Sequence, residues 1–161
     1  MKNSGSVHLS ELLSPARIIL DLKSVDREHV LEELVNHIPE LAEQPEAQRT
    51  LLRALHEREQ LYSTSIGDGI ALPHSRNALV GLVDHSLIVF GRHAKGIPYG
   101  APDALPARLF FLVVAPTVTQ HLAILARLIR LLRDPKLRQQ LQTAADARKV
   151  IDVVAEAEAS M

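Results

Sequence analysis

The six residues from Leu109 to Val114 are all apolar, and this run constrains the fold more than any other feature of the sequence. A short, uninterrupted apolar run is typical of a buried β-strand. We therefore predict a strand over residues 107–114 and a second buried strand over 86–90, with the glycine- and proline-bearing stretch 96–102 as a loop or hairpin connection. A third, short strand is predicted at 18–22. Buried strands must be covered by other elements.

The sequence also shows the helical periodicity of elements that could cover these strands. Apolar residues three and four positions apart predict a helix that is capped by Ser24 or Asp26 and closed by Pro39, and another over about 45–58. Strands interleaved with helices indicate an α/β fold in which helices cover a mostly buried sheet.

The second half of the chain is strongly helical. A leucine-rich pattern predicts a helix from Thr117 that Asp134-Pro135 ends, and shorter helical patterns follow at 137–141 and 150–155. One face of the first of these helices is expected to be apolar, formed by Leu122, Leu125, Leu128, Ile129 and Leu132.

The composition excludes several classes of function. The 161 residues fit one domain, 1–161, with the 47% hydrophobic content of an ordinary globular protein. Eighteen basic residues nearly balance nineteen acidic ones, so no positive excess favours nucleic acid or acidic lipid. The absence of cysteine excludes thiolate chemistry and fits a cytoplasmic location. No apolar stretch is long enough for membrane insertion, and the first residues contain no export signal.

His74 is the best placed of the eight histidines to act as a nucleophile. It follows the apolar residues 70–72, which a loop containing Gly67 and Gly69 introduces. A strand end beside a loop can hold a side chain rigidly and still leave it within reach of a partner. An imidazole with a pKa of about 6.5 is largely neutral at pH 7, so it can attack a phosphoryl group.

Further residues could stabilise such a group. His121 lies near the predicted start of the leucine-rich helix, with Thr117 or Thr119 as the cap. The positive end of a helix favours a neutral imidazole and attracts oxyanions. Arg58 could offer its forked donors to a phosphate, and the hydroxyls of Ser63 and Thr64 could add two more.

Each of these residues also has a purely structural interpretation. Taken singly, His74 and His121 would be surface or packing residues, and the glycines of 67–69 would form an ordinary turn. Glu57 and Glu59 would be solvated carboxylates. No metal is expected, because neither histidine has ligands at a recognised spacing. No cofactor is expected either, since the chain lacks a nucleotide-binding glycine loop.

In combination, the residues form a specific string: Arg58-Glu59, Ser63-Thr64, Ile66-Gly67 and Gly69 to His74. This string resembles the phosphorylation-site signature of phosphotransferase-system (PTS) IIA domains of the fructose/mannitol and nitrogen-regulatory type. The run from Leu109 to Val114, followed by His121-Leu122 and a leucine-rich helix, matches the same family in order and spacing. The resemblance covers most of the chain.

The resemblance implies a single EIIA type-2 domain with a mixed, parallel and antiparallel sheet of about five strands covered by helices. It implies that His74 is phosphorylated, that His121 stabilises the phosphoryl group and that Arg58 contacts it. The residues expected to support the phosphate from the loop are Ser63, Thr64, Gly67 and Gly69. The donor would be phosphorylated HPr or its nitrogen-branch relative, and neither a nucleotide nor a metal would be needed.

Four residues depart from the family pattern: Ser65, Asp68, Ser75 and Ala104. Asp68 is expected to bring negative charge near the phosphate, and Ser75 to bond or crowd it. Nitrogen-regulatory members stand alone at about this length, so we favour a regulatory phosphocarrier that binds target proteins. The alternatives are the IIA component of a fructose/mannitol-type uptake system, which would pass the group to a sugar-specific IIB acceptor, and an interaction-only module that has lost phosphotransfer.

Overall fold

A mixed β-sheet forms the centre of the molecule in the computed structural model, which describes residues 7–77, 79 and 81–161. The described strands are β1 (Ile18–Ile19), β2 (Ser65–Gly67), β3 (Ile70–Ala71), β4 (Leu87–Ile97) and β5 (Ala107–Val114), in the order β1-β4-β5-β3-β2. β4 and β5 pair antiparallel, β1 and β3 join them in parallel, and β2 runs antiparallel to β3. The predicted α/β class and mixed five-stranded sheet are confirmed.

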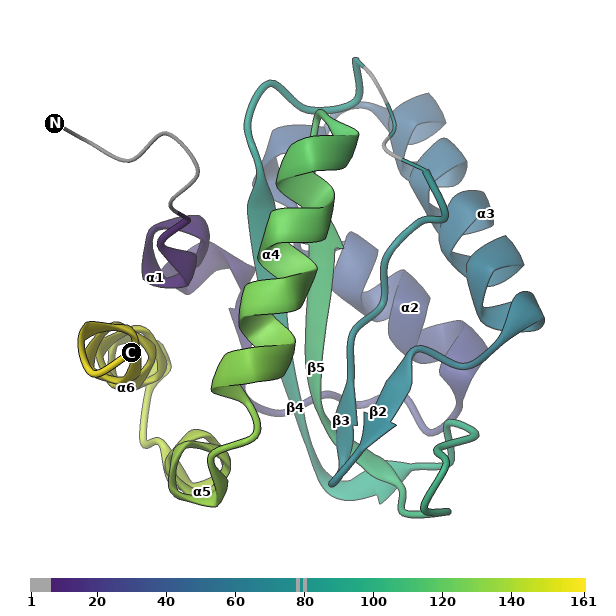
Figure 1. Ribbon diagram of the computed structural model, residues 1–161. Coiled ribbons are helices and arrows are strands. Elements are labelled where there is room, and N and C mark those ends of the chain that lie inside the picture. The colour runs from purple at the N-terminus through teal and green to yellow at the C-terminus, as the bar shows by residue number, and fades with distance from the viewer. Residues whose placement is uncertain (1–6, 78, 80) are drawn as a thin grey trace, which may run out of the picture.

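Helices cover both faces of this sheet (Figure 1). One side carries α2 (Arg27–Val35) and α3 (Pro45–Leu61). The other side carries α1 (Leu9–Leu12), α4 (Val118–Leu131), α5 (Pro135–Thr143) and α6 (Ala147–Ala159). The described residues also form two short 3₁₀ turns, Pro15–Arg17 and Pro39–Leu41.

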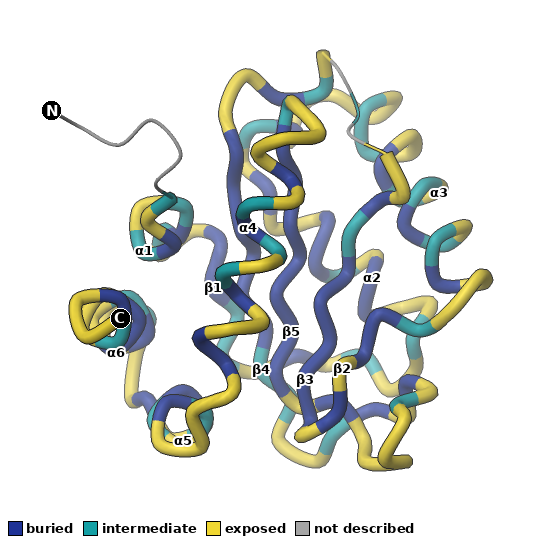
Figure 2. The backbone as a smooth tube through the Cα atoms, in the orientation of Figure 1, coloured by how far each residue is buried: buried dark blue, intermediate teal, exposed yellow. Residues whose placement is uncertain are grey.

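The position of β5 between two layers of helices explains why every residue from Leu109 to Val114 is apolar. Leu109, Phe111 and Val113 pack in the cluster that includes α4, α5 and α6. Phe110 and Leu112 point the opposite way, into the cluster with α2 and α3. Successive side chains of a strand face opposite sides of the sheet, so burial on both sides removes the need for polar residues. Figure 2 shows most of the strand as a buried segment at the centre of the molecule.

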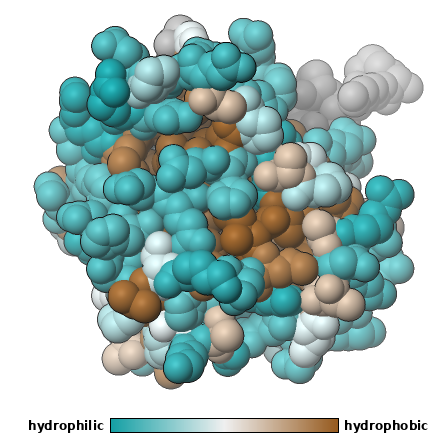
Figure 3. Space-filling model, turned by 180° about the vertical axis from the view of Figure 1, so that it is seen from behind, coloured by the Kyte–Doolittle hydropathy of each residue, from teal (hydrophilic) through white to brown (hydrophobic). Residues whose placement is uncertain are grey.

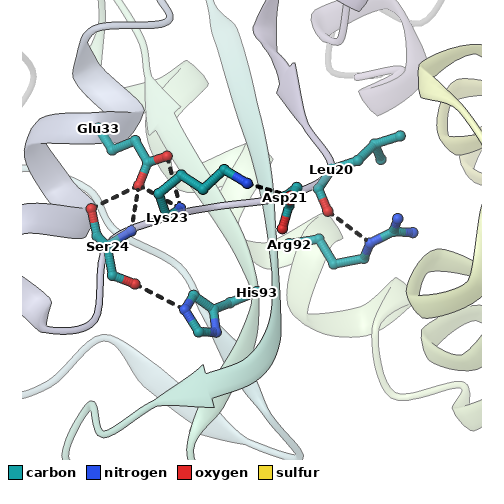
Figure 4. A network of polar contacts seen from close by, with 7 residues as sticks. All are labelled: Leu20, Asp21, Lys23, Ser24, Glu33, Arg92 and His93. Atoms are coloured by element: carbon teal, nitrogen blue, oxygen red, sulfur yellow. Dashed lines mark hydrogen bonds and ion pairs between the residues drawn. The ribbon is translucent and has the colours of Figure 1, made fainter.

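β4 is longer than the sequence indicated, since it continues from residue 87 to Ile97 rather than ending near 90. The polar residues that hid this extension form contacts of their own. Arg92 donates from Nε to the Leu20 carbonyl, and His93 Nε2 lies 2.8 Å from the Ser24 carbonyl (Figure 4). These contacts fasten the far end of β4 to the segment that leads into α2.

The buried face of α4 differs in part from the prediction, since Leu128 and Leu132 are buried and Leu125 packs against the core as expected. The helix buries His121, Ile124, Leu128 and Leu131, whereas Leu122 is 62% exposed and Ile129 is also exposed. Leucine-rich helices carry apolar residues on more than one face, so periodicity alone could not choose between them. The short helix α1 was not predicted, because four residues are too few to show a period.

Charged and polar side chains dominate the surface seen from behind, and apolar side chains reach it in bounded patches (Figure 3). Within the described residues, no helix combines the length and apolar character needed to cross a bilayer.

Glu158 on α6 joins three elements through one buried carboxylate. It accepts the backbone N–H groups of Leu9 and Ser10 at 2.6 and 3.0 Å, and Nε of Arg127 on α4 at 2.9 Å. Burial by itself raises the pKa of Glu158, but the three donors outweigh this effect and lower the pKa below its ordinary 4.5. A carboxyl group whose pKa is lower in the folded chain stabilises the fold at pH values above its ordinary pKa. This stabilisation is lost as the pH falls and the carboxylate is protonated.

We predict that Glu158→Gln lowers the free energy of unfolding by roughly 2–4 kcal/mol near neutral pH, because three donors lose a charged acceptor. The difference from the unmodified protein should shrink as the pH falls below 4.5. Urea unfolding at about pH 7 and about pH 3 measures both effects. The exposed Glu156→Gln on the same helix is the control, and an equal loss in the two variants would contradict the prediction.

Candidate functional site

His74 lies just beyond β3, at the end of the sheet where β5 leads into α4. β3 runs parallel to β5, and the Val113 N–H donates to the Pro73 carbonyl at 3.0 Å, which holds the residues before His74 against the end of β5. On the other side, the Leu72 N–H donates to the Thr64 carbonyl at 3.1 Å. The backbone leading to His74 is therefore fixed from both sides, while its side chain is half-buried.

One hydrogen bond sets the protonation pattern of the His74 ring. Its Nδ1 lies 2.7 Å from the Leu72 carbonyl oxygen. A carbonyl only accepts hydrogen bonds, so Nδ1 carries the hydrogen and donates it. In the neutral ring this leaves the lone pair on Nε2, which is the nitrogen available for attack.

His121 lies against His74, although 46 residues separate them in the chain. The two ring centroids are 5.3 Å apart and the ring planes are nearly perpendicular, at 81°. The Thr117 side chain caps α4 by accepting the Gln120 N–H, which places His121 in the first turns of the helix. His121 is only 5% exposed, and its Nε2 is buried without a hydrogen-bond partner among the residues that the structure describes.

Both imidazoles are held neutral at physiological pH. Burial, together with a smaller effect of the neighbouring His74, lowers the pKa of His121 to about 4. Burial is also the largest effect on His74 and lowers its pKa; the Leu72 carbonyl raises it, and the charge of Arg58 lowers it again. Neutral His74 retains the lone pair that a nucleophile requires.

Arg58 stands beside this pair at the end of α3. Its Nη1 donates to the Tyr62 carbonyl at 2.5 Å, which orients the guanidinium. Arg58 and Ser75 line a common cleft of about 430 Å³ between α3 and the segment after His74. The Ser75 hydroxyl donates to the Asn77 carbonyl, so its hydrogen is already used within the segment.

The hydroxyls of Ser63 and Thr64 are also engaged. Ser63 donates to the Tyr99 carbonyl, and Thr64 donates to the carboxylate of Glu59. Glu59 is 3% exposed, so the expectation that it is a solvated carboxylate is wrong. A charged residue within a helical pattern is ordinarily exposed, and only the partners Thr64 and Tyr99 explain why this one is buried.

The glycine turn lies at the opposite end of the strand from His74. The N–H groups of Arg108 and Leu109, at the start of β5, donate to the Gly69 carbonyl. Gly67 and Gly69 have φ angles of +90° and +78°, which a glycine adopts without strain. Their geometry is that of a tight β2–β3 turn rather than of a phosphate cradle.

Asp68 belongs to the same turn, with a φ of +56°. Its carboxylate lies 3.9 Å from Arg138 on α5, and its N–H donates to Asp103. The expectation that Asp68 brings negative charge to the phosphate is therefore wrong, because the extended strand carries the chain away from the turn before His74 is reached. Ala104 has a φ of +63°, the conformation that makes glycine frequent at this position.

Over the described ranges, no three histidine, aspartate or glutamate side chains gather as a metal site would require. Among the described residues, the histidine pair has no carboxylate arranged with it as a third ligand.

The mixed five-stranded sheet covered by helices is the fold of solved PTS IIA structures. The chain belongs to the family described as phosphoenolpyruvate-dependent sugar phosphotransferase system, EIIA 2, whose model matches residues 11–157.

Curated relatives include both regulatory and transport proteins. The chain is 32% identical over 149 residues to a nitrogen regulatory protein of Bradyrhizobium diazoefficiens, covering 91% of this chain and 94% of that protein. It is 34% identical over 148 residues to the fructose-specific EIIABC component of Bacillus subtilis, covering 91% of this chain but only 23% of that protein.

A solved structure shows the same fold. The nitrogen regulatory protein IIA-Ntr of Neisseria meningitidis superimposes with a TM-score of 0.77 at 28% identity, covering 90% of this chain and 97% of that one.

We predict that burial of neutral His121 makes stability fall as the solution is acidified. The pKa of His121 is about 4 in the fold and 6.5 without it, so the unfolded chain binds a proton between these values that the folded chain does not. Between pH 7 and pH 5 this should cost on the order of 1–2 kcal/mol. Unfolding free energies of the unmodified protein and of His121→Gln at the two pH values measure this loss. The exposed His85→Gln is the control. The same dependence of unfolding free energy on pH in all three proteins would contradict the prediction.

Proposed function

We propose that this protein accepts a phosphoryl group on His74 Nε2 from the phosphohistidine of HPr or of its nitrogen-branch relative, and acts as a nitrogen-regulatory phosphocarrier. The observation that carries the proposal is the hydrogen bond from His74 Nδ1 to the Leu72 carbonyl, which leaves Nε2 with its lone pair. Membership of the EIIA type-2 family supports the same class of chemistry.

The transfer is a direct exchange between two imidazoles. The lone pair of His74 Nε2 forms a bond to phosphorus as the N–P bond of the donor breaks, and the donor imidazole keeps the electron pair of that bond. Phosphorylation at Nε2 makes the His74 ring cationic while Nδ1 keeps its hydrogen. The Leu72 carbonyl, which already accepts that hydrogen, stabilises the cationic ring. Transfer onward reverses these steps.

Two groups are suited to stabilise the moving phosphoryl group. His121 Nε2 is buried and has no hydrogen-bond partner in the described part of the chain, so a phosphoryl oxygen can satisfy it. Arg58 supplies a permanent positive charge from the neighbouring helix, and a guanidinium matches the geometry of phosphate oxygens. Preorganised donors of this kind act where charge develops during transfer.

The surface beside His121 is suited to docking of other proteins. Val118 and Leu122 lie on the outer side of the first turns of α4 and are 57% and 62% exposed. Leu61 and Tyr62, which follow Arg58, are also exposed. Apolar side chains beside a reactive group allow a donor and then a target to pack against it in turn. A phosphoryl dianion would make such packing costly, so unmodified protein should bind flat apolar partners better.

Similarity to nitrogen regulatory proteins supports the regulatory role. The chain spans nearly the full length of the Bradyrhizobium nitrogen regulatory protein. Similarity to the fructose-specific protein of Bacillus subtilis favours a second candidate, a IIA component that passes the group to a sugar-specific IIB acceptor. An interaction-only module is the third, and phosphate acceptance separates it from the other two.

We predict that incubation with phosphorylated HPr-like donor adds one acid-labile phosphate to the protein, and that His74→Ala abolishes it. Intact-mass analysis followed by site mapping at neutral pH measures both. The exposed His85→Ala should be labelled normally. Labelling of folded His74→Ala would move the nucleophile elsewhere, and no labelling of the unmodified protein would favour the interaction-only module. Chelator treatment should leave the labelling unchanged.

Leu122→Gln should raise the KM for the phosphorylated donor roughly tenfold, because an exposed apolar contact beside the site is lost. The fold should be unaffected, since the side chain is mostly in solvent. Val25→Gln, which alters an exposed apolar residue before α2, should leave the KM unchanged. Equal KM values for both variants would remove Leu122 from the docking surface.

A further inference from the structure

Glu59 is a buried carboxylate that the proposed transfer does not use. It follows Arg58 on α3 and is 3% exposed. It accepts the Thr64 N–H at 2.9 Å, the Thr64 hydroxyl, and the Tyr99 hydroxyl at 2.8 Å. A buried carboxylate is costly unless donors surround it, and here three donors from two different segments do so.

The contacts of Glu59 continue toward the nucleophile. Thr64, which Glu59 holds by its N–H and its hydroxyl, accepts the Leu72 N–H at its carbonyl, at 3.1 Å. The Leu72 carbonyl then accepts the hydrogen of His74 Nδ1 at 2.7 Å. Three successive hydrogen-bonded links therefore connect the carboxylate to the imidazole. Pro73 adds rigidity between Leu72 and His74, because its ring restricts the backbone.

We propose that Glu59 is a positioning residue for His74. By holding Thr64, it places the Leu72 carbonyl where only the Nδ1–H form of the ring is satisfied, and so presents Nε2 for attack. Glu59 does not touch the phosphoryl group. The catalytic part of this inference rests on the proposed function, whereas the effect on the His74 ring exists without any phosphoryl donor.

The charges around His74 agree with this arrangement. Burial lowers the pKa of His74, the Leu72 carbonyl raises it, the Arg58 guanidinium lowers it, and the Glu59 carboxylate raises it. His121, the other group against the ring, is neutral because its own pKa is about 4. Glu59 thus offsets part of the effect of Arg58, and its removal should lower the pKa of His74.

Glu59→Gln tests the proposal, because an amide of the same size lacks the charge and cannot accept all three donors. We expect ¹⁵N NMR of the His74 ring to show a reduced fraction of the Nδ1–H form and a lower pKa. Phosphoryl acceptance should slow roughly 10- to 100-fold, as misplacement of a reacting group does. Tyr99→Phe is the matched control: it removes one donor from the same carboxylate but leaves the Thr64 link, so the ring form and rate should stay close to those of the unmodified protein.

Two results would overturn the proposal: an unchanged ring form in Glu59→Gln, or equal changes in Glu59→Gln and Tyr99→Phe, which would indicate general loosening. If Glu59→Gln does not fold, Thr64→Val removes the hydroxyl link alone and should shift the ring form in the same direction; no shift there would also overturn it. Failure of the unmodified protein to accept phosphate would instead reject the proposed function, while the ring measurement would still decide the role of Glu59.

Discussion

Burial of β5 on both faces is the constraint on which the rest of the structure depends. A strand with apolar side chains on both sides is stable only between two layers, so α2 and α3 must pack on one face and α4 to α6 on the other. The same strand positions the site. Its C-terminal end leads into α4 and His121, and its parallel pairing with β3 brings His74 to the same end of the sheet.

This placement explains how a common residue type acquires a special environment. The histidine pair lies between a strand end and a helix start, so that burial keeps both rings neutral. A backbone carbonyl then selects the nitrogen that bears the hydrogen. The fold thus places the proposed nucleophile, His74, against the neutral ring of His121. The chemistry requires rigid placement more than unusual residues.

Polar side chains secure the backbone by hydrogen bonds at both ends of the sheet. At the turn end, Asp103 accepts the Asp68 N–H and secures the glycine turn. At the site end, Glu59 holds Thr64, which pairs with the residues that lead to His74. Departures from the family pattern have different consequences in these two places: Asp68 adjusts a turn remote from His74, whereas Ser75 lies directly beside it and bonds its own segment.

The sequence by itself determined the α/β class, the bounds of β5, the start of the leucine-rich helix and the residues of the histidine string, because each follows from local pattern or a short motif. Tertiary structure alone decided which face of α4 is buried, how far β4 extends, and that the glycine turn lies away from His74. It also decided that His74 meets His121 and that Glu59 is buried. These features depend on contacts between residues distant in the chain, such as Tyr99 with Glu59, and local periodicity carries no information about such contacts.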